Sequence, residues 1–263
     1  MNQLKLFDSH CHLDDRSFAG DLESTILNAR KTGVTSMMTV GVDLKSSLRA
    51  LELAQSYSGV YASVGVHPHD AQSCSDDMIR RLRHLAQAVE VRAWGEIGLD
   101  FNRMYSPQAD QEKWFVRQLI EADQLGIPLI FHERDSRGRF LELLSNHPNP
   151  ERKGVVHCFS GDADDLSAYL DLGFCIGITG IVTIKARGAR LRELVPGIPL
   201  NRLLIETDAP YLTPAPQKNK NRRNEPAFVK SVLLKLADVR QEPIETLAAA
   251  TTANARRLFG ITN

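Results

Sequence analysis

Short apolar runs alternate along the chain with longer segments in which apolar residues recur every three or four positions. A run of four to eight apolar residues is typical of a buried strand, and the longer period is typical of an amphipathic helix. The pattern therefore predicts strands joined by helices. We expect strands at Leu4–His10, Val34–Val40, Val60–Val66, Val91–Ile97, Pro128–His132, Gly154–Cys158, Phe174–Ile178 and Leu203–Glu206.

The helical segments fall between these strands and after the last one. They are Asp21–Lys31, Lys45–Tyr57, Asp76–Ala88, Gln108–Leu125, Arg139–Ser145, Ala163–Leu172, Ala189–Leu194, Phe228–Asp238 and Ile244–Phe259. Eight strand–helix units without a break in composition favour one α/β domain over residues 1–263, a (β/α)₈ TIM barrel with its active site at the C-terminal ends of the strands. The alternative is an open doubly wound sheet, which normally has a Gly-rich phosphate loop after its first strand. No such loop follows the first strand here.

Composition narrows the class of protein. The 32 basic and 32 acidic residues give a formal net charge of zero, so any site for a polyanion must be local. The four cysteines form no Cys-x-x-Cys pair, which argues against a disulfide framework and fits a reducing compartment. We find no signal peptide and no apolar stretch of the ~20 residues that span a bilayer. We therefore expect a cytoplasmic protein that does not bind membranes.

Polar residues gather where the predicted strands end, and these ends share one mouth in a barrel. His10 and His12 are two residues apart on the first strand, so they project from the same face, as does Asp8. One histidine at a strand end is usually structural, but six of the eight histidines occupy such positions. The other residues at strand ends are His67, His69, Glu96, His132, His157, Glu206 and Asp208.

Metal ligation explains this convergence. Four imidazoles and two carboxylates exceed the four ligands of a structural zinc site, and they fit two divalent ions, Mg²⁺, Mn²⁺ or Zn²⁺. A carboxylate such as Glu96 can bridge the ions. Two ions ~3.5–4 Å apart activate water for hydrolysis of phosphate esters or amides. We therefore predict a hydrolase, with a non-catalytic metal- or nucleic-acid-binding protein as the alternative. The candidate ligands are His10, His12, Glu96, His132, His157 and Asp208.

Other residues suggest roles around the metals. Asp208 is the candidate general base, unless it serves only as a ligand. Glu206 either orients the site or anchors a neighbouring ligand. His67 polarises a phosphate oxygen or is structural, and Asp100 anchors His67, binds substrate or shapes its loop. Arginines suit phosphate contact, and basic residues expected at the rim include Arg134, Lys218, Lys220, Arg222 and Arg223. Cys11 and Cys158 are expected to point into the barrel wall.

Several short motifs together resemble one family. The chain contains Asp8-Ser9-His10-Cys11-His12, Gly65-Val66-His67-Pro68, Gly95-Glu96-Ile97-Gly98-Leu99-Asp100, His132, His157-Cys158-Phe159-Ser160-Gly161, Glu206-Thr207-Asp208-Ala209-Pro210 and Arg223-Asn224-Glu225-Pro226. With these motifs the chain resembles, nearly end to end, the TatD family of metal-dependent deoxyribonucleases among the amidohydrolase-like barrels.

This resemblance implies a first metal on His10, His12, Glu96 and Asp208, and a second on Glu96, His132 and His157. It implies substrate contacts by Arg223 and Asn224. Dihydroorotase-like enzymes usually carry a carboxylated lysine at the position of Glu96, so the glutamate favours phosphodiesters over cyclic amides. The expected activity is a 3'–5' exonuclease that acts on single-stranded DNA or frayed ends, as a monomer without an obligate protein partner. An amidohydrolase or small-molecule phosphoesterase on the same metal site is the alternative.

Overall fold

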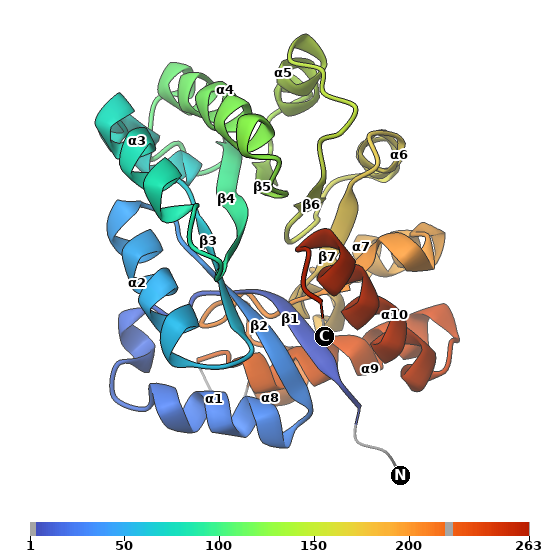
Figure 1. Cartoon of the computed structure of the whole chain (residues 1–263). Coiled ribbons are helices and arrows are strands. Elements are labelled where there is room, and N and C mark those ends of the chain that lie inside the picture. Colours follow the sequence, from blue (N-terminus) through green and yellow to red (C-terminus); the bar gives the residue numbers. More distant parts are fainter. Residues whose placement is uncertain (1–3, 219–222, 263) are drawn as a thin grey trace.

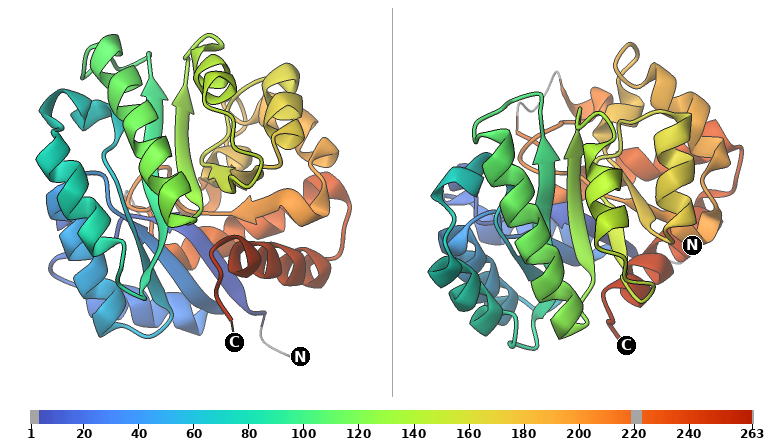
Figure 2. Two further views of the ribbon diagram at one scale, coloured as in Figure 1. Left: turned by 45° about the horizontal axis from the view of Figure 1, so that its top comes forward. Right: turned by 90° about the horizontal axis from the view of Figure 1, so that it is seen from above.

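A computed structural model of the chain describes residues 4–218 and 223–262. Its eight strands are parallel and follow one another around a single sheet in chain order. Figures 1 and 2 show this sheet curled into a barrel with the helices outside it, which confirms the predicted TIM barrel. The strands are β1 (Leu6–Cys11), β2 (Val34–Val40), β3 (Val60–Val64), β4 (Val91–Asp100), β5 (Leu129–Arg134), β6 (Gly154–Val156), β7 (Cys175–Ile178) and β8 (Leu203–Ile205).

All nine predicted helices are present, and one short helix, α8, lies in the loop after β8. Several strands are one or two residues shorter than predicted, and because β6 ends at Val156, His157 lies in the loop after it rather than on the strand. His67 follows β3 in a loop, as expected. Lys220 and Arg222 lie outside the described residues. No described helix has both the length and the apolarity needed to cross a membrane. The helices are α1 (Leu22–Lys31), α2 (Leu44–Ser56), α3 (Asp76–Leu85), α4 (Gln108–Leu125), α5 (Arg139–Asn146), α6 (Ala163–Asp171), α7 (Ala189–Leu194), α8 (Ala215–Lys218), α9 (Val229–Arg240) and α10 (Ile244–Leu258).

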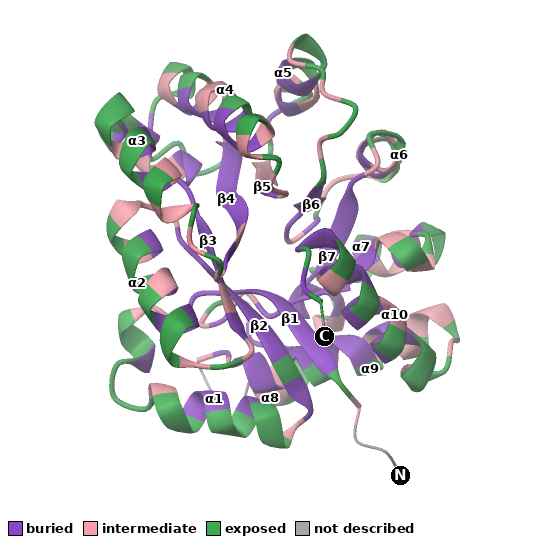
Figure 3. Cartoon of the chain, in the orientation of Figure 1, coloured by how far each residue is buried: buried purple, intermediate pink, exposed green. Residues whose placement is uncertain are grey.

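The interior of the barrel forms a small apolar core of its own, separate from the larger core between strands and helices. Figure 3 shows the strands as almost entirely buried. Phe7 on β1 contributes to the interior core, and its ring lies 5.9 Å from that of Phe259, directly after α10. The end of the C-terminal helix therefore plugs the barrel and closes its core against water.

The seam between β1 and β8 is closed differently at its two ends. On the side of the metal-ligand candidates, the backbone N–H of His12 donates to the carbonyl of Ala209 over 2.7 Å. On the opposite side α10 covers the seam, where Thr252 donates to the carbonyl of Lys5 and Asn254 to that of Leu203. The barrel is thus closed by a short backbone contact above and by a helix below.

The register of β1 against β2 shifts between Asp8 and Cys11. Strict alternation of faces is therefore broken, and the prediction that Asp8 shares a site with the two histidines is wrong. The Asp8 carboxylate is fully buried and accepts hydrogen bonds from the backbone N–H and hydroxyl of Thr207, at 2.8 and 2.6 Å. Burial raises the pKa of Asp8 to about 8. This residue ties β1 to the segment after β8.

Replacing Phe259 by Ala should destabilise the barrel more than any exposed change on the neighbouring helix. Phe259 is almost fully buried against the barrel interior, and removing such a ring leaves a cavity that costs about 3–5 kcal/mol of unfolding free energy. Leu234 on α9 is half exposed, so Leu234→Ala should change stability by only about 0.5 kcal/mol. Urea denaturation of the two variants tests this, and equal stability would show that the plug does not support the barrel.

Candidate metal centre

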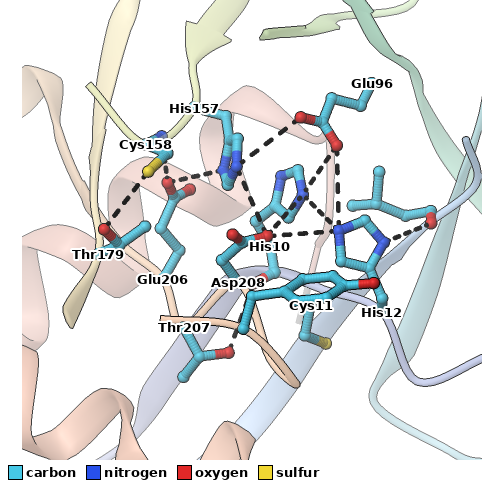
Figure 4. A network of polar contacts seen from close by, with 12 residues as sticks. His10, Cys11, His12, Glu96, His157, Cys158, Thr179, Glu206, Thr207 and Asp208 are labelled. Atoms are coloured by element: carbon cyan, nitrogen blue, oxygen red, sulfur yellow. Dashed lines mark hydrogen bonds and ion pairs between the residues drawn. The ribbon is translucent and has the colours of Figure 1, made fainter. Parts of the chain in front are cut away.

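The predicted ligands converge at the carboxyl ends of the strands. His10 lies near the end of β1 and His12 directly follows that strand, whereas Glu96 lies on β4 and His132 on β5. His157 directly follows β6, and Asp208 lies three residues after the end of β8. Figure 4 shows His10, His12, Glu96, His157 and Asp208 pointing toward one another.

A first group of ligand atoms surrounds one point between β1 and β8. The His10 and His12 Nε2 atoms are 3.3 Å apart, and Asp208 Oδ1 lies 3.3 Å from His12 Nε2 and 3.7 Å from His10 Nε2. Glu96 Oε2 completes the group at 3.4 Å from His10 Nε2. Ligands at tetrahedral zinc distances lie about 3.4 Å from one another, so the donor type and spacing of these atoms fit one divalent ion.

The other oxygen of Glu96 faces a second group. Glu96 Oε1 lies 2.6 Å from His132 Nδ1 and 3.8 Å from His157 Nε2. Among the described residues, Glu96 is therefore the side chain whose two oxygens reach both groups. Burial alone would favour a protonated carboxyl, but the imidazoles of His67, His10 and His157 hold the pKa of Glu96 well below its usual range. An ionised carboxylate between two ligand groups is what a bridging residue requires.

Three ligand histidines have their second ring nitrogen against an acceptor. His12 Nδ1 lies 3.2 Å from the carbonyl of Val40, and His132 Nε2 lies 3.3 Å from Asp100 Oδ2. His157 Nδ1 lies 2.8 Å from Glu206 Oε1. An acceptor at one ring nitrogen fixes the proton there and leaves the lone pair of the other nitrogen for a metal. These contacts direct His12 Nε2, His132 Nδ1 and His157 Nε2 toward the two groups.

Glu206 is fully buried behind His157 rather than in the mouth. Its carboxylate accepts hydrogen bonds from the hydroxyl of Ser9 and from the backbone N–H of Cys158, at 3.2 and 2.6 Å. Gly177 on β7 makes room for it, because a Cβ there would lie about as close as 2.5 Å to the carboxylate. This geometry favours Glu206 as an anchor for His157, one of the two roles that the sequence left open.

Gly98 places β4 against β5 at the site. Its φ of 149° is unfavourable for other residues, and a Cβ at this position would overlap the carbonyl oxygen of His132. Gly98 pairs with His132 in the register of the two strands. The close approach that the glycine permits brings Glu96 and His132 into contact.

His67 is held as a neutral hydrogen-bond donor. Its Nδ1 accepts the backbone N–H of His69 over 3.0 Å, so the ring proton of the neutral form sits on Nε2. Burial lowers the pKa of His67 to about 4. The Nε2 atom lies 3.4 Å from Glu96 Oε1. His67 therefore presents an N–H to the second group instead of a lone pair.

Asp100 holds His69 and His132 and makes no contact with His67 among the described residues. Its Oδ2 lies 2.7 Å from His69 Nε2, and its Oδ1 accepts the backbone N–H groups of Asn102 and Arg103. Burial opposes ionisation, but the hydrogen bonds from the two imidazoles hold the pKa of Asp100 far below its usual range. Of the three roles left open, two fit: Asp100 shapes its own loop, and it anchors imidazoles, although these are His69 and His132 rather than His67.

Of the five predicted substrate contacts, His67, Asp100 and Arg134 lie in the mouth, and Arg223 and Asn224 lie outside it. A cavity of about 840 Å³ opens over the ligands, and Arg134 lines it. Arg223 instead binds both oxygens of Asp21 at 2.7 Å and packs on the ring of Phe18. Asn224 is fully buried and donates to the carbonyls of Thr207 and Tyr211.

Neither Arg223 nor Asn224 lines the cavity. Their contacts hold the loop after β8 in place instead.

Cys11 is buried as expected, in the core between strands and helices, where it donates to the carbonyl of Met38. Cys158 agrees with the prediction only in part, because it packs on the same core but also lines the mouth cavity. The sequence prediction missed Arg103, Tyr105 and Arg187, which also line the cavity. They lie in loops, where no strand period gives their direction.

The chain is similar to known proteins over nearly its whole length. The family model described as "TatD related DNase" matches residues 7–260. The chain is 43% identical over 258 residues to the 3'-5' ssDNA/RNA exonuclease TatD of Klebsiella pneumoniae (strain 342), covering 97% of this chain and 98% of that protein. It is 42% identical over 259 residues to the protein of the same name from Pantoea ananatis (strain LMG 20103), covering 97% and 100%.

Solved structures are similar as well. The crystal structure of YJJV, a TatD homologue from Escherichia coli K12, superimposes with a TM-score of 0.91 at 30% identity, covering 99% of this chain and 100% of that one. A TatD-family hydrolase from Entamoeba histolytica shares the fold with a TM-score of 0.88 at 22% identity, with full coverage of both chains. The match to the family model and the level of identity to these relatives show that the chain belongs to the TatD-related DNase family.

Proposed function

We propose that this chain is a divalent-metal-dependent exonuclease that hydrolyses single-stranded DNA from the 3' end, using two ions. The observation that carries the proposal is the position of Glu96, whose two oxygens face two separate groups of imidazoles. The TatD relatives act from 3' to 5' on single-stranded DNA or RNA according to their names, which supports the polarity. His10, His12, Glu96 and Asp208 would hold one ion, and Glu96, His132 and His157 the other.

Hydrolysis transfers the terminal nucleotide to water. The water oxygen bonds to phosphorus, and the bond from phosphorus to the 3'-oxygen of the preceding nucleotide breaks. The products are a nucleoside 5'-monophosphate and a strand with a new 3'-hydroxyl. Two bound Mg²⁺, Mn²⁺ or Zn²⁺ ions would supply Lewis acidity to the phosphate and lower the pKa of the water.

The side chains divide the remaining work. Asp208 Oδ1 faces the imidazoles, which leaves Oδ2 to accept the proton of the water. The Nε2–H of His67 donates to a non-bridging phosphate oxygen as charge builds there. Glu206 keeps the ring of His157 in place.

All of these residues belong to one chain, which supports action as a monomer. The four cysteines are free thiols, which supports a cytoplasmic location.

The decisive experiment follows product release from a 3'- or 5'-labelled oligonucleotide by the protein loaded with Mg²⁺, Mn²⁺ or Zn²⁺. We expect successive release of 5'-mononucleotides from the 3' end, with double-stranded DNA degraded more slowly and EDTA stopping the reaction. A panel of small phosphate esters and cyclic amides is tested in parallel. Turnover confined to that panel would refute the exonuclease and support the alternative hydrolase.

A further inference from the structure

Three arginines that line the mouth cavity, Arg103, Arg134 and Arg187, have no partner within the described parts of the chain, and the first two lie at or just after the ends of the neighbouring strands β4 and β5. Arg103 follows β4 and Arg134 ends β5, and both line the mouth cavity. Neither guanidinium makes an ion pair or a hydrogen bond to any described residue. By contrast, Arg139 binds Glu112 and Glu142, outside the mouth. An arginine without a carboxylate partner at a cavity wall is available to bind a phosphate.

Two tyrosines expose their rings in the same cavity. Tyr105 is 63% exposed and Tyr211 is 54% exposed, although both carry large apolar faces. Each ring packs edge-on against a histidine of the site, Tyr105 against His69 at 4.7 Å and Tyr211 against His12 at 5.8 Å. An exposed ring at the edge of a nucleic-acid site provides a surface on which a base can stack.

The two tyrosines lie at opposite ends of the metal centre. His12, against which Tyr211 packs, faces Glu96 Oε2, whereas His67 faces Glu96 Oε1. The ring of His67 in turn lies 4.2 Å from that of His69, against which Tyr105 packs. A continuous series of contacts thus leads from one tyrosine through Glu96 to the other. A phosphate placed at Glu96 has one tyrosine on each side.

The charged side chains near the two tyrosines are not the same. The hydroxyl of Tyr211 lies 3.4 Å from Asp15 Oδ2, and burial together with the charges of Asp15, Asp208 and Asp14 raises the pKa of Tyr211 to about 12. Tyr105 lies two residues after Arg103, and Arg134 pairs in register with Asp100 at the start of the same loop. Two of the three unpaired arginines thus belong to the segments around Tyr105, where the Asp100 carboxylate is already bound by His69 and His132. Asp15 lies beside Tyr211 instead, so we expect backbone phosphates to be held mainly on the Tyr105 side.

From this asymmetry we propose that Tyr211 stacks on the 3'-terminal base, that Tyr105 stacks on the next base, and that the rest of the strand leaves past Arg103 and Arg134. The inference rests on the proposed exonuclease and adds the path of its substrate. Only a terminal nucleoside, which has no further phosphate, suits the acidic end of the site. The same feature explains why cleavage removes one nucleotide at a time.

Oligonucleotides that lack a single base test this path. Wild-type enzyme is compared with Tyr105→Ala on three strands: intact, abasic at the second position from the 3' end, and abasic at the 3' terminus. Losing one base–aromatic stack should lower kcat/KM about tenfold. Tyr105→Ala should lose about tenfold on the intact strand and nothing further when the second base is missing. Tyr211→Ala should show the same behaviour toward the terminal base, and Tyr105→Phe should behave like wild type.

The arginines are tested through salt dependence. The double variant Arg103→Ala/Arg134→Ala should flatten the slope of log Kd against log salt by about 1.4, since each lost contact to a single strand removes about 0.7. The matched controls are Met104→Ala, next to Tyr105, and Arg137→Ala, an exposed arginine three residues after Arg134. Neither of these residues lines the mouth cavity, and both variants should match wild type.

The outcomes distinguish a wrong strand path from a wrong proposed function. The stacking assignment would be overturned if Tyr105→Ala lowered kcat/KM as much on the second-position abasic strand as on the intact strand. An unchanged salt slope for the double arginine variant would overturn the path of the strand. A wild-type enzyme that releases no nucleotide from any intact strand would instead refute the proposed function itself. Circular dichroism checks that each variant is folded, which is expected because Tyr105 is mostly exposed.

Discussion

Glu96→Gln is expected to remove nearly all nuclease activity and to leave the protein with fewer than two bound ions. An amide cannot supply a charged oxygen to each group of imidazoles, so both ion sites lose a ligand. Metal-ion catalysis contributes several kcal/mol to the transition state, and its loss should lower kcat about 1,000-fold or more. Inductively coupled plasma mass spectrometry counts the ions, and release of labelled mononucleotides gives the rate.

The matched control for this change is Glu133→Gln. Glu133 lines the same cavity and accepts the backbone N–H of Ser136, but it faces neither ligand group. This variant should keep both ions and normal turnover. If Glu96→Gln also kept two ions and normal turnover, Glu96 would not be the bridge, and the two-ion proposal would lose its main support.

Asp208→Asn should separate catalysis from folding. An asparagine preserves the shape of the side chain but cannot accept a proton, and loss of a general base lowers kcat by about 10²- to 10⁴-fold. Burial raises the pKa of Asp208, but the hydrogen bond from His12 and the charges of His157 and His10 outweigh this effect and lower the pKa below its usual range. The wild-type carboxylate is therefore ionised at neutral pH. Single-turnover cleavage of a 3'-labelled strand measures the effect.

Asp70→Asn provides the comparison, because Asp70 lines the mouth without joining either ligand group. We expect this variant to cleave at the wild-type rate. Wild-type rates for Asp208→Asn with normal metal content would assign proton transfer to another group and leave Asp208 as a ligand only.

The architecture and the convergence of the candidate ligands were predictable for one physical reason. Strand and helix periods are local properties of the sequence, and a parallel barrel brings every strand end to one mouth. His10, Glu96 and His132 are far apart in sequence, yet their positions at strand ends were enough to place them together. The family resemblance added the division of the ligands between two ions.

The remaining features depend on contacts that local patterns do not encode. Arg223 resembled a phosphate ligand in sequence, but its partner Asp21 lies 202 residues away. Anchoring of His67 was one of three roles left open for Asp100, whereas the loop after β3 brings His69 to it instead. The register shift in β1 redirected Asp8 to Thr207. In each case a tertiary contact, formed only after the barrel closes, decides the partner of a polar side chain.

The seam between β1 and β8 also determines when activity can arise during synthesis. His10 and His12 leave the ribosome first, whereas Asp208 follows the last strand and the plug around Phe259 comes later still. A nascent or truncated chain that ends before residue 208 therefore lacks a ligand, the proposed base and the closed barrel at once. Such a fragment cannot cleave nucleic acid, so the order of the chain itself confines nuclease activity to completed molecules.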